Sequence, residues 1–557
     1  MRDDRGLRRV KDRLPWQLWV VAIIGFWERA TFWGLTAPWQ NYMEHPRHFD
    51  MEHTPGALGL GQTMATRIYC GFFILYFTIP LFIAPLADSL LGQYKTLVLS
   101  LLVYCLGCIS LTVSSLPINL DRGWGLPGLI LSLVLIGLGG GGSQATMRSF
   151  IANQYTDRKA KVIRLKSGEQ VMTDAELTVK YIYNVYFWMG NVGALLAFPT
   201  VYIERHYGFA PAYGLGLGCL VISIAMLVVG KSHYVKKPHT DDVMIPAAKI
   251  VTCAARNGFK MERADPEYQL AHHGKIVSWS GELVKGITRG LGACRVLLAF
   301  IMFYICFDQM QNNLVSQASD MNTGSTPNDV LPGMNQVACI LISPLVSYVL
   351  DPFLAKRRIY LKPITRITIG FVFITLTMLY ATVVQHAIYS SPPCYDHPTK
   401  CGDRQADAQQ RPNVWIQAPL YFLMAAGEVF AMTTAMEYAE THAPKEMEVL
   451  VQAIGMLITG MGSAIALVIA EAARDPYLTW FYTSLTCGMA FTAVAFWCIF
   501  RKYDQNPTDS PTLTDPEKAT GDVPATPFVA TDDTAKHPEP TVAQAQATSD
   551  EDTPAVS

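Results

Sequence analysis

The sequence predicts an all-α integral membrane protein with twelve transmembrane helices in two six-helix bundles and both termini in the cytoplasm. The composition is the first observation behind this prediction. Of 557 residues, 50% are hydrophobic and only 16% are charged, whereas soluble domains are near 25% charged. Apolar runs of about 20 residues, long enough to cross a bilayer, also recur along the chain, and a polar gap divides them into two equal sets.

The first set of runs covers about residues 16–40, 66–88, 95–115, 127–152, 180–203 and 212–231. The second set covers about residues 292–314, 331–352, 364–388, 414–436, 447–472 and 476–500. The expected organisation is a cytoplasmic N-terminus (1–15), a first bundle (16–231), a cytoplasmic linker (232–291), a second bundle (292–500) and a cytoplasmic tail (501–557). A short helix is expected within the linker. The tail is rich in Pro, Thr, Ala and Asp, which predicts disorder.

Loop charges predict the orientation. Basic residues gather between the fourth and fifth runs, after the eighth run and after the twelfth run, on the side of the basic N-terminus. The positive-inside rule therefore puts these loops and both termini in the cytoplasm.

Two bundles joined by a cytoplasmic linker favour a secondary transporter of the major facilitator type, whose bundles move about a site at the bilayer midplane. The formal net charge of −1 favours no nucleic-acid partner; the lipid bilayer and a small solute are the expected partners.

The residues from Gly25 to Gly34 (GFWERATFWG) place Glu28 and Arg29 near the middle of the first run. A charged side chain at bilayer depth costs about 3 kcal/mol on insertion scales, so such residues usually face a polar interior and carry function. We expect this pair to mark a transport pathway. A purely architectural ion pair is the alternative.

Two glycine-containing motifs accompany this pair. Ala87 to Thr96 (ADSLLGQYKT) joins the second and third runs with the loop spacing of major facilitators. There, Asp88 can hold the positive end of a facing helix and Gly92 permits a tight turn.

Gly137 to Gly142 formally satisfies G-x-G-x-x-G, but it follows a bilayer-length run and not a strand. Close helix packing is therefore expected here, and nucleotide binding is not.

Several segments together resemble the proton-dependent oligopeptide transporters, particularly their fungal branch. Glu28 to Gly34 resembles the end of the family's first-helix signature E-x-x-E-R-F-x-Y-Y-G. The other matches are ADSLLGQYKT and the segments 136–155, 181–195, 307–318 and 426–444. The resemblance implies alternating-access transport of small peptides or peptide-like solutes with proton symport. It implies no enzymatic activity and no cofactor beyond the proton gradient, and we expect a monomer in the plasma membrane.

The chain departs from this family at two positions. The first-helix signature begins with Glu where this chain has Gly25. The fourth-helix pattern G-G-I-K-P reads GGSQA here, so neutral Gln144 replaces the basic residue that pairs with the first-helix acids and receives a peptide's carboxylate. Glutamine keeps hydrogen bonding but removes the point charge. Both departures weaken the expectation of proton coupling and of ordinary peptide substrates.

The resemblance also implies roles for individual residues. Glu28 and Arg29 would couple protons, while Glu428, in the middle of the tenth run, would meet a substrate's ammonium group. The other substrate contacts would be Asn184, Asn335, Gln144 and Trp33, and the gating residues would be Asp88, Gly92 and Asp308. Interhelical linkage is the alternative for the asparagines, and packing is the alternative for Trp33. From spacing alone, Asp308, Gln311 and Asn312 are expected to form one polar stripe on a helix, and Asn184 is expected to share a face with Asn191.

The twelve cysteines lie mostly within apolar runs, where they act as small hydrophobes. Cys394 and Cys401 lie in a polar loop, and a disulfide between them is expected if that loop is extracellular. Two alternative functions stay open. One is a proton-antiport exporter of a peptide-derived secondary metabolite, and the other is a non-transporting nutrient sensor.

Overall fold

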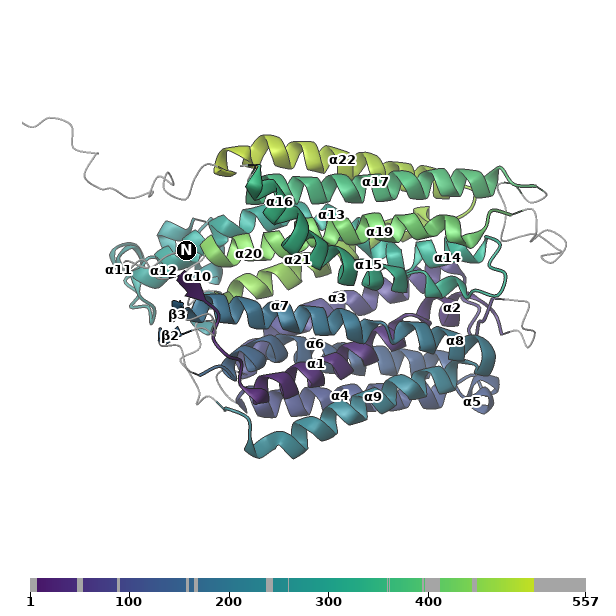
Figure 1. Ribbon diagram of the computed structural model, residues 1–557, viewed down its shortest axis with the longest axis horizontal. Coiled ribbons are helices and arrows are strands. Elements are labelled where there is room, and N and C mark those ends of the chain that lie inside the picture. The colour runs from purple at the N-terminus through teal and green to yellow at the C-terminus, as the bar shows by residue number, and fades with distance from the viewer. Residues whose placement is uncertain are drawn as a thin grey trace, which may run out of the picture. The chain divides into compact units, whose positions relative to one another are not determined.

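The computed structural model describes residues 8–47, 54–87, 91–156, 160–164, 169–236, 244–258, 260–357, 359, 361–392, 395, 411–442 and 448–504. Helices make up most of this part of the chain (Figure 1). The helices before the linker are α1 (Trp16–Thr36), α2 (Trp39–Glu44), α3 (Gln62–Leu86), α4 (Gln93–Ser114), α5 (Pro117–Asp121), α6 (Gly125–Asn153), α7 (Ala175–Ala194), α8 (Ala197–Tyr207) and α9 (Phe209–Val229).

The helices of the linker are α10 (Met244–Arg256), α11 (Pro266–His273) and α12 (Gly281–Cys294), the last of which leads into the second half. The second half contains α13 (Phe300–Asp308), α14 (Asn313–Ser319), α15 (Gly333–Pro344), α16 (Asp351–Lys356), α17 (Pro363–Tyr389), α19 (Ala418–Gly427), α20 (Thr433–His442), α21 (Glu448–Ile469) and α22 (Leu478–Phe500). Short 3₁₀ turns join several of these helices: η4 (Arg295–Ala299), η5 (Gln309–Gln311), η6 (Asn328–Val330) and η10 (Val414–Gln417). Two π-helical turns are also present, η7 (Leu345–Leu350) and η11 (Glu428–Met432).

Eleven helical segments among the described residues are long and apolar enough to cross a membrane. They overlap eleven of the predicted runs. The predicted run at 180–203 corresponds to α7 and α8, which are separated by a turn at Leu195 and Leu196. The predicted helical membrane fold is confirmed. The count of twelve spans, the orientation of the termini and the domain boundaries stay predictions.

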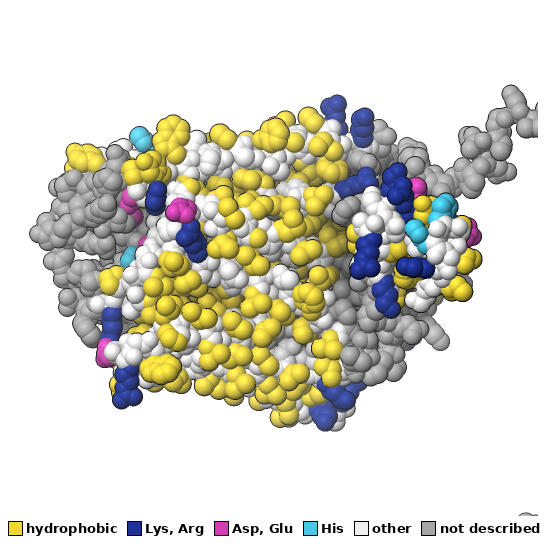
Figure 2. All heavy atoms as spheres, turned by 180° about the vertical axis from the view of Figure 1, so that it is seen from behind, with side chains coloured by type: hydrophobic (Ala, Val, Ile, Leu, Met, Phe, Trp, Pro, Cys, Tyr) yellow, Lys and Arg dark blue, Asp and Glu magenta, His cyan; other side chains and the backbone are white. Residues whose placement is uncertain are grey.

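The surface of the helices is built for lipid. Figure 2 shows hydrophobic side chains across the middle of the molecule, with most charged side chains toward its two ends. Helix α4 illustrates the cause: Leu99, Leu102, Leu106 and Ile109 are exposed, whereas Leu101 and other residues on the opposite face are buried. Spacings of three and four residues place the exposed side chains on one face of the helix. An apolar surface of this extent fits a membrane environment.

The buried hydrophobic residues form two large clusters. One runs from Leu18 to Tyr234 and lies entirely in the first half. The other lies mainly between Cys294 and Phe496, with a few residues from the first half. A third, smaller cluster belongs to the linker and joins α10 to α12 through Ala247, Ile250, Ala254, Ala264, Val284 and Ile287. The expected linker helix is present as α10, and the linker has a small core of its own.

Three short strands form a small sheet. Strand β1 (Arg8–Val10) pairs in parallel with β3 (Gln170–Thr173), which pairs antiparallel with β2 (Val162–Arg164). Strands this short show no periodic pattern, and we did not predict them.

Helix α6 packs closely against α4. A Cβ added at Gly139 of α6 would lie 2.3 Å from the Tyr104 backbone nitrogen of α4. The close packing predicted for the glycine motif is therefore confirmed.

Candidate functional site

Glu28 and Arg29 lie on α1 and form a buried polar cluster with side chains from α3 and α6. The Arg29 Nε and Nη2 atoms donate to the two carboxylate oxygens of Glu28, each at 2.7 Å. Nη2 also donates to the Tyr76 hydroxyl at 2.9 Å, and the Ser143 hydroxyl donates to Glu28 at 3.1 Å. The exposed fractions of the Glu28 and Arg29 side chains are 2% and 13%. A buried ion pair persists when good geometry and further hydrogen bonds offset its desolvation, as they do here.

Gln144 contacts the same guanidinium group. With its amide oxygen oriented by the hydrogen-bond network, Gln144 accepts from Arg29 Nη1 at 2.7 Å and from the Tyr76 hydroxyl at 3.2 Å. A lysine in this place would put a second positive charge next to Arg29. Gln144 instead supplies a neutral acceptor, so the nitrogens of Arg29 are all engaged within the protein.

The position of the missing first-helix acid is filled by an aromatic ring. A Cβ added at Gly25 would lie 2.6 Å from Cε2 of Tyr186, on α7. The Tyr186 ring is buried, and its hydroxyl has no hydrogen-bond partner among the described residues. An acidic side chain at position 25 therefore requires Tyr186 to move. Gly25 and Tyr186 form a matched pair in this structure.

A second polar cluster surrounds Glu428 in the other half. Glu428 begins the π turn η11, and its Oε2 accepts from the Asn335 amide at 3.1 Å and from the Cys339 thiol at 3.5 Å. Both partners lie on α15. No described lysine or arginine lies within ion-pair distance of this carboxyl group, which is 9% exposed. Because π turns occur frequently at functional sites and a buried charge requires a partner, this carboxyl is suited to receive either a proton or a cationic ligand.

The other predicted substrate contacts, Trp33, Asn335, Gln144 and Asn184, do not lie together in one cluster. Trp33 is partly buried and packs against both large hydrophobic clusters. Asn335 belongs to the Glu428 cluster, and Gln144 belongs to the Arg29 cluster. Asn184 is exposed and makes no described hydrogen bond, whereas Asn191 is buried and donates to the Phe187 carbonyl at 3.0 Å. The two asparagines lie seven residues apart on the continuous helix α7, so they share a face as expected, although only Asn191 is buried.

Asp308 lies where the seventh run breaks. It is the last residue of α13 and accepts from the Ser463 hydroxyl of α21 at 2.6 Å. The chain then passes through η5 and Asn312 (φ −126°, ψ −91°) before α14 begins. The predicted continuous stripe of Asp308, Gln311 and Asn312 is therefore wrong. The Asn312 side chain accepts from the next backbone N–H, a local bond of the kind that competes with helix geometry.

Hydrogen bonds join the two halves at the end of the molecule that carries α2, α5, α8 and α14 (Figure 1). We call this the outer end, because the positive-inside rule predicts that it is extracellular. The contacts are Gln62 to Asn313 at 3.0 Å, Gln40 to Ser316 at 3.2 Å, the reciprocal amides of Asn41 and Asn328 at 2.9 and 2.8 Å, and Arg205 to the Gly324 carbonyl at 3.0 Å. The outer end is thus closed by direct side-chain contacts.

Three predicted residues, Asp88, Cys394 and Cys401, lie outside the described residues. Gly92 is described, and its φ of +78° immediately before α4 is a conformation that favours glycine. Toward the other end of the molecule, α3 and α21 meet through an apolar cluster of Leu81, Ala84, Ala145 and Ala453.

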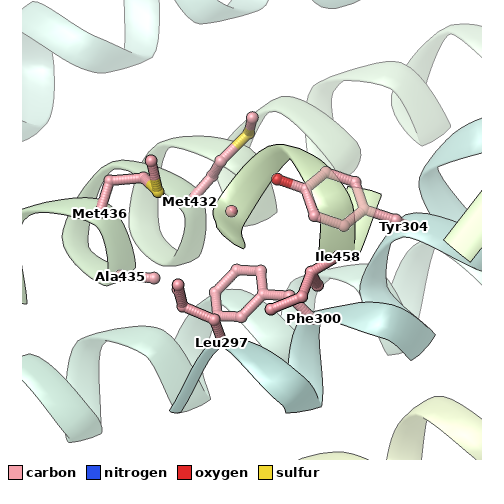
Figure 3. A pocket seen from close by; sticks show the side chains of 8 residues that line it. Leu297, Phe300, Tyr304, Met432, Ala435, Met436 and Ile458 are labelled. Atoms are coloured by element: carbon pink, nitrogen blue, oxygen red, sulfur yellow. The ribbon is translucent and has the colours of Figure 1, made fainter. Parts of the chain in front are cut away.

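A small apolar pocket (Figure 3) adjoins η11, the turn that Glu428 begins. Its cavity volume is about 10 Å³, enough for about one water molecule, and it is lined by Leu297, Phe300, Tyr304, Met432, Ala435, Met436, Gly455 and Ile458. Met432 ends the π turn that Glu428 begins, and Tyr304 lies close enough to Glu428 to interact with it electrostatically. An acidic group next to apolar side chains can contact an amine that carries an apolar group. Among the described residues, no group of three or more His, Cys, Asp or Glu side chains could hold a metal ion.

Comparison with known proteins identifies the family. A family model described as PTR2, POT family, matches residues 94–485. The chain belongs to the POT family. This POT-family chain is 34% identical over 503 residues to the probable peptide transporter ptr2 of Schizosaccharomyces pombe, covering 89% of this chain and 80% of that protein. It is 32% identical to the peptide transporter PTR2 of Saccharomyces cerevisiae, covering 89% and 81%. The solved structure of the POT family transporter PepTSo aligns with a TM-score of 0.67 at 17% identity, covering 89% of this chain and all of that one.

The predicted resemblance to proton-dependent oligopeptide transporters is confirmed by these matches. Sequence reasoning missed several partners that complete the two clusters of this POT-family protein, namely Tyr76, Ser143, Tyr186 and Cys339. Each is a small or aromatic residue inside an apolar run, where it looks like ordinary packing. The proximity of Ser143 to Gln144 in the sequence was the one available signal.

Proposed function

We propose that this protein is a proton-coupled secondary transporter that moves small peptides or peptide-like solutes by alternating access. The observation that carries the proposal is the presence of one buried carboxylate cluster in each half of a helical membrane protein. Glu28 is neutralised by Arg29, and Glu428 has only neutral partners. Membership of the POT family and similarity to proteins named peptide transporters support the same function.

The geometry favours a substrate with an ammonium group. Glu428 would receive the ammonium, Asn335 would orient the Glu428 carboxylate, and neighbouring apolar side chains such as Met432 would contact an apolar part of the substrate. Trp33, Gln144 and Asn184 are proposed as further contacts. Because Arg29 is engaged by Glu28, Tyr76 and Gln144, a free peptide carboxylate has no unoccupied cationic partner in this cluster. Peptide-like solutes whose carboxylate is absent or masked are therefore the favoured class.

The Glu28 and Arg29 pair supplies the proposed coupling step. In the structure, Arg29 donates to both side-chain oxygens of Glu28. If substrate binding or bundle movement draws Arg29 away, Glu28 is left in a low-dielectric interior and binds a proton. We propose that the transporter needs no cofactor beyond the proton gradient, catalyses no covalent reaction, and functions as a monomer in the plasma membrane.

A proton-antiport exporter is a second candidate, because Arg29 is engaged within the Glu28 cluster and offers no unoccupied cation to a peptide carboxylate there. It would use the same two clusters, with flux in the opposite direction. A non-transporting sensor would bind ligand without turnover.

The test is solute uptake by proteoliposomes that contain the full chain under an imposed proton gradient. Labelled dipeptides with a free or an amidated C-terminus are the substrates. We expect the gradient to drive accumulation, and the amidated dipeptide to be taken up at least as well as the free one. Efflux coupled to proton entry would favour the exporter, and binding without movement in either direction would favour the sensor.

A further inference from the structure

Two buried acids face each other at the outer end, and the transport steps above do not use them. Glu204 lies on α8 in the first half, and Asp329 lies in η6 in the second half. Each residue is 2% exposed. The two carboxyl groups are close enough to interact directly, and none of their four oxygens has a hydrogen-bond partner of standard geometry among the described residues. They therefore meet only because the two halves are in contact.

Few described groups around this carboxyl pair stabilise a negative charge on it. None of its four oxygens accepts a well-aligned hydrogen bond from the described residues. The Asn41 side chain is adjacent, but its amide is engaged in the reciprocal pair with Asn328. Arg205 is the nearby cation; it donates to the Gly324 carbonyl and forms no ion pair with either acid among the described contacts. The hydroxyls of Tyr213 and Tyr42 are also titratable groups near the pair among the described residues.

Hydrogen-bond chemistry then limits the protonation of the pair. An ionised carboxylate is an acceptor only, so two of them cannot bond to each other. Two like charges at this distance in a buried site also repel strongly, and such pairs normally hold one proton between them. We propose that Glu204 and Asp329 form a proton-binding site that is assembled when the two halves close at the outer end.

The proposal predicts that closure of the outer end consumes a proton. When the halves separate, both carboxyls face water and are ionised at neutral pH. When the halves meet, one proton is bound between them. Acid therefore favours the closed outer end, and closure is lost as the pH rises. For one proton, the ratio of closed to open molecules changes by up to about tenfold per pH unit.

This site would add a second proton-linked step to a chain that has Gly25 in place of the family's first acid. Its use in transport rests on the proposed function, whereas the proton binding itself does not.

The test measures the outer-end distance as a function of pH in the full chain, reconstituted in lipid nanodiscs. Spin labels are placed at Ile118→Cys on α5 and Trp415→Cys in η10, which are exposed positions on opposite halves, after the accessible native cysteines are replaced by serine. Distance distributions are recorded by double electron–electron resonance between pH 5 and pH 8. We expect the short-distance population to decrease as the pH rises. In the Glu204→Gln/Asp329→Asn variant, that population should be independent of pH, because two amides hydrogen-bond without a proton.

Glu471→Gln is the matched control. Glu471 also pairs across the two halves, with Arg67 at 2.6 Å, but its side chain is 66% exposed, so the pH response should be unchanged. Glu28→Gln should likewise keep the response while losing gradient-driven accumulation, which separates this proposal from the proposed function. A double-amide variant with the wild-type pH response, or a wild type without one, would overturn the proposal. If the double variant does not fold, the single variant Asp329→Asn is measured instead. The new amide of residue 329 can donate to the Glu204 carboxylate without a bound proton, so the pH response should again be lost. A wild-type pH response in this single variant would also overturn the proposal.

Discussion

The side chain of Arg29 illustrates how single residues define this transporter. Its nitrogens contact Glu28, Tyr76 and Gln144, so it acts as a hub of the first-half cluster. The space at Gly25 is occupied by the Tyr186 ring, so the loss of the family's first acid is accommodated by packing. The cluster keeps one acid and one base, and it lacks both the second acid and the lysine of the family pattern.

The first prediction concerns Gln144→Lys. The new ammonium group would lie beside Arg29, where repulsion frees donors for an anionic ligand. We expect the affinity for a dipeptide with a free C-terminus to rise by about tenfold, because hydrogen bonds to charged groups contribute roughly 1.5–3 kcal/mol. Ligand binding measured by thermal stabilisation checks this. Gln144→Met is the uncharged control of similar size, and equal affinities in the two variants would contradict the expectation.

At this scale, the sequence predicted the costly residues and missed their partners. Glu28, Arg29 and Glu428 were predictable because charges inside apolar runs are rare and expensive. Tyr186 and Cys339 were not, because a tyrosine or cysteine in a membrane helix has many uses. Asn184 was assigned by family pattern to the substrate site, and the structure shows it exposed with no described hydrogen bond.

Among the elements, the uninterrupted helices and the interrupted ones differ in how well they could be predicted. Bilayer-length runs predicted twelve spans, and eleven of them overlap described helical segments long and apolar enough to cross a membrane, because hydropathy summed over a window is a strong signal. The break after Asp308 and the π turn at Glu428 depend on local hydrogen bonds and tertiary packing, which the periodic pattern does not contain. Both interruptions carry acidic residues, as expected where irregular backbone is buried within the protein at membrane depth.

A second prediction tests the close packing of α4 against α6. Gly139→Ala places a methyl group 2.3 Å from a backbone atom of α4, so the helices must separate. We expect a destabilisation of about 1–3 kcal/mol, as for other overpacked sites, measured as a lower melting temperature in detergent. Gly218→Ala in α9 is the matched control, because a Cβ there meets nothing within 4 Å. Equal melting temperatures for the two variants would show that the contact is not tight.

The whole molecule combines two polar clusters, one in each half, with an outer end closed by hydrogen bonds. Trp33 packs against both large hydrophobic clusters. The family matches and the charge pattern of the loops predict how this architecture sits in the membrane. The hydrogen bonds between the halves join residues far apart in the sequence, for example 119 positions for Arg205 and Gly324 and 247 for Thr66 and Asn313, so no local pattern could predict them.

The central claim is that the two buried carboxylates perform separate tasks, proton coupling at Glu28 and amine binding at Glu428. The most direct measurement compares gradient-driven accumulation with substrate exchange in proteoliposomes for Glu28→Gln and Glu428→Gln. We predict that Glu28→Gln abolishes accumulation but retains exchange, because binding and bundle movement survive without the proton. Glu428→Gln should reduce both by at least about tenfold, the effect of losing roughly 1.4 kcal/mol of binding free energy. Equal loss of both activities in Glu28→Gln, or full exchange in Glu428→Gln, would contradict the account.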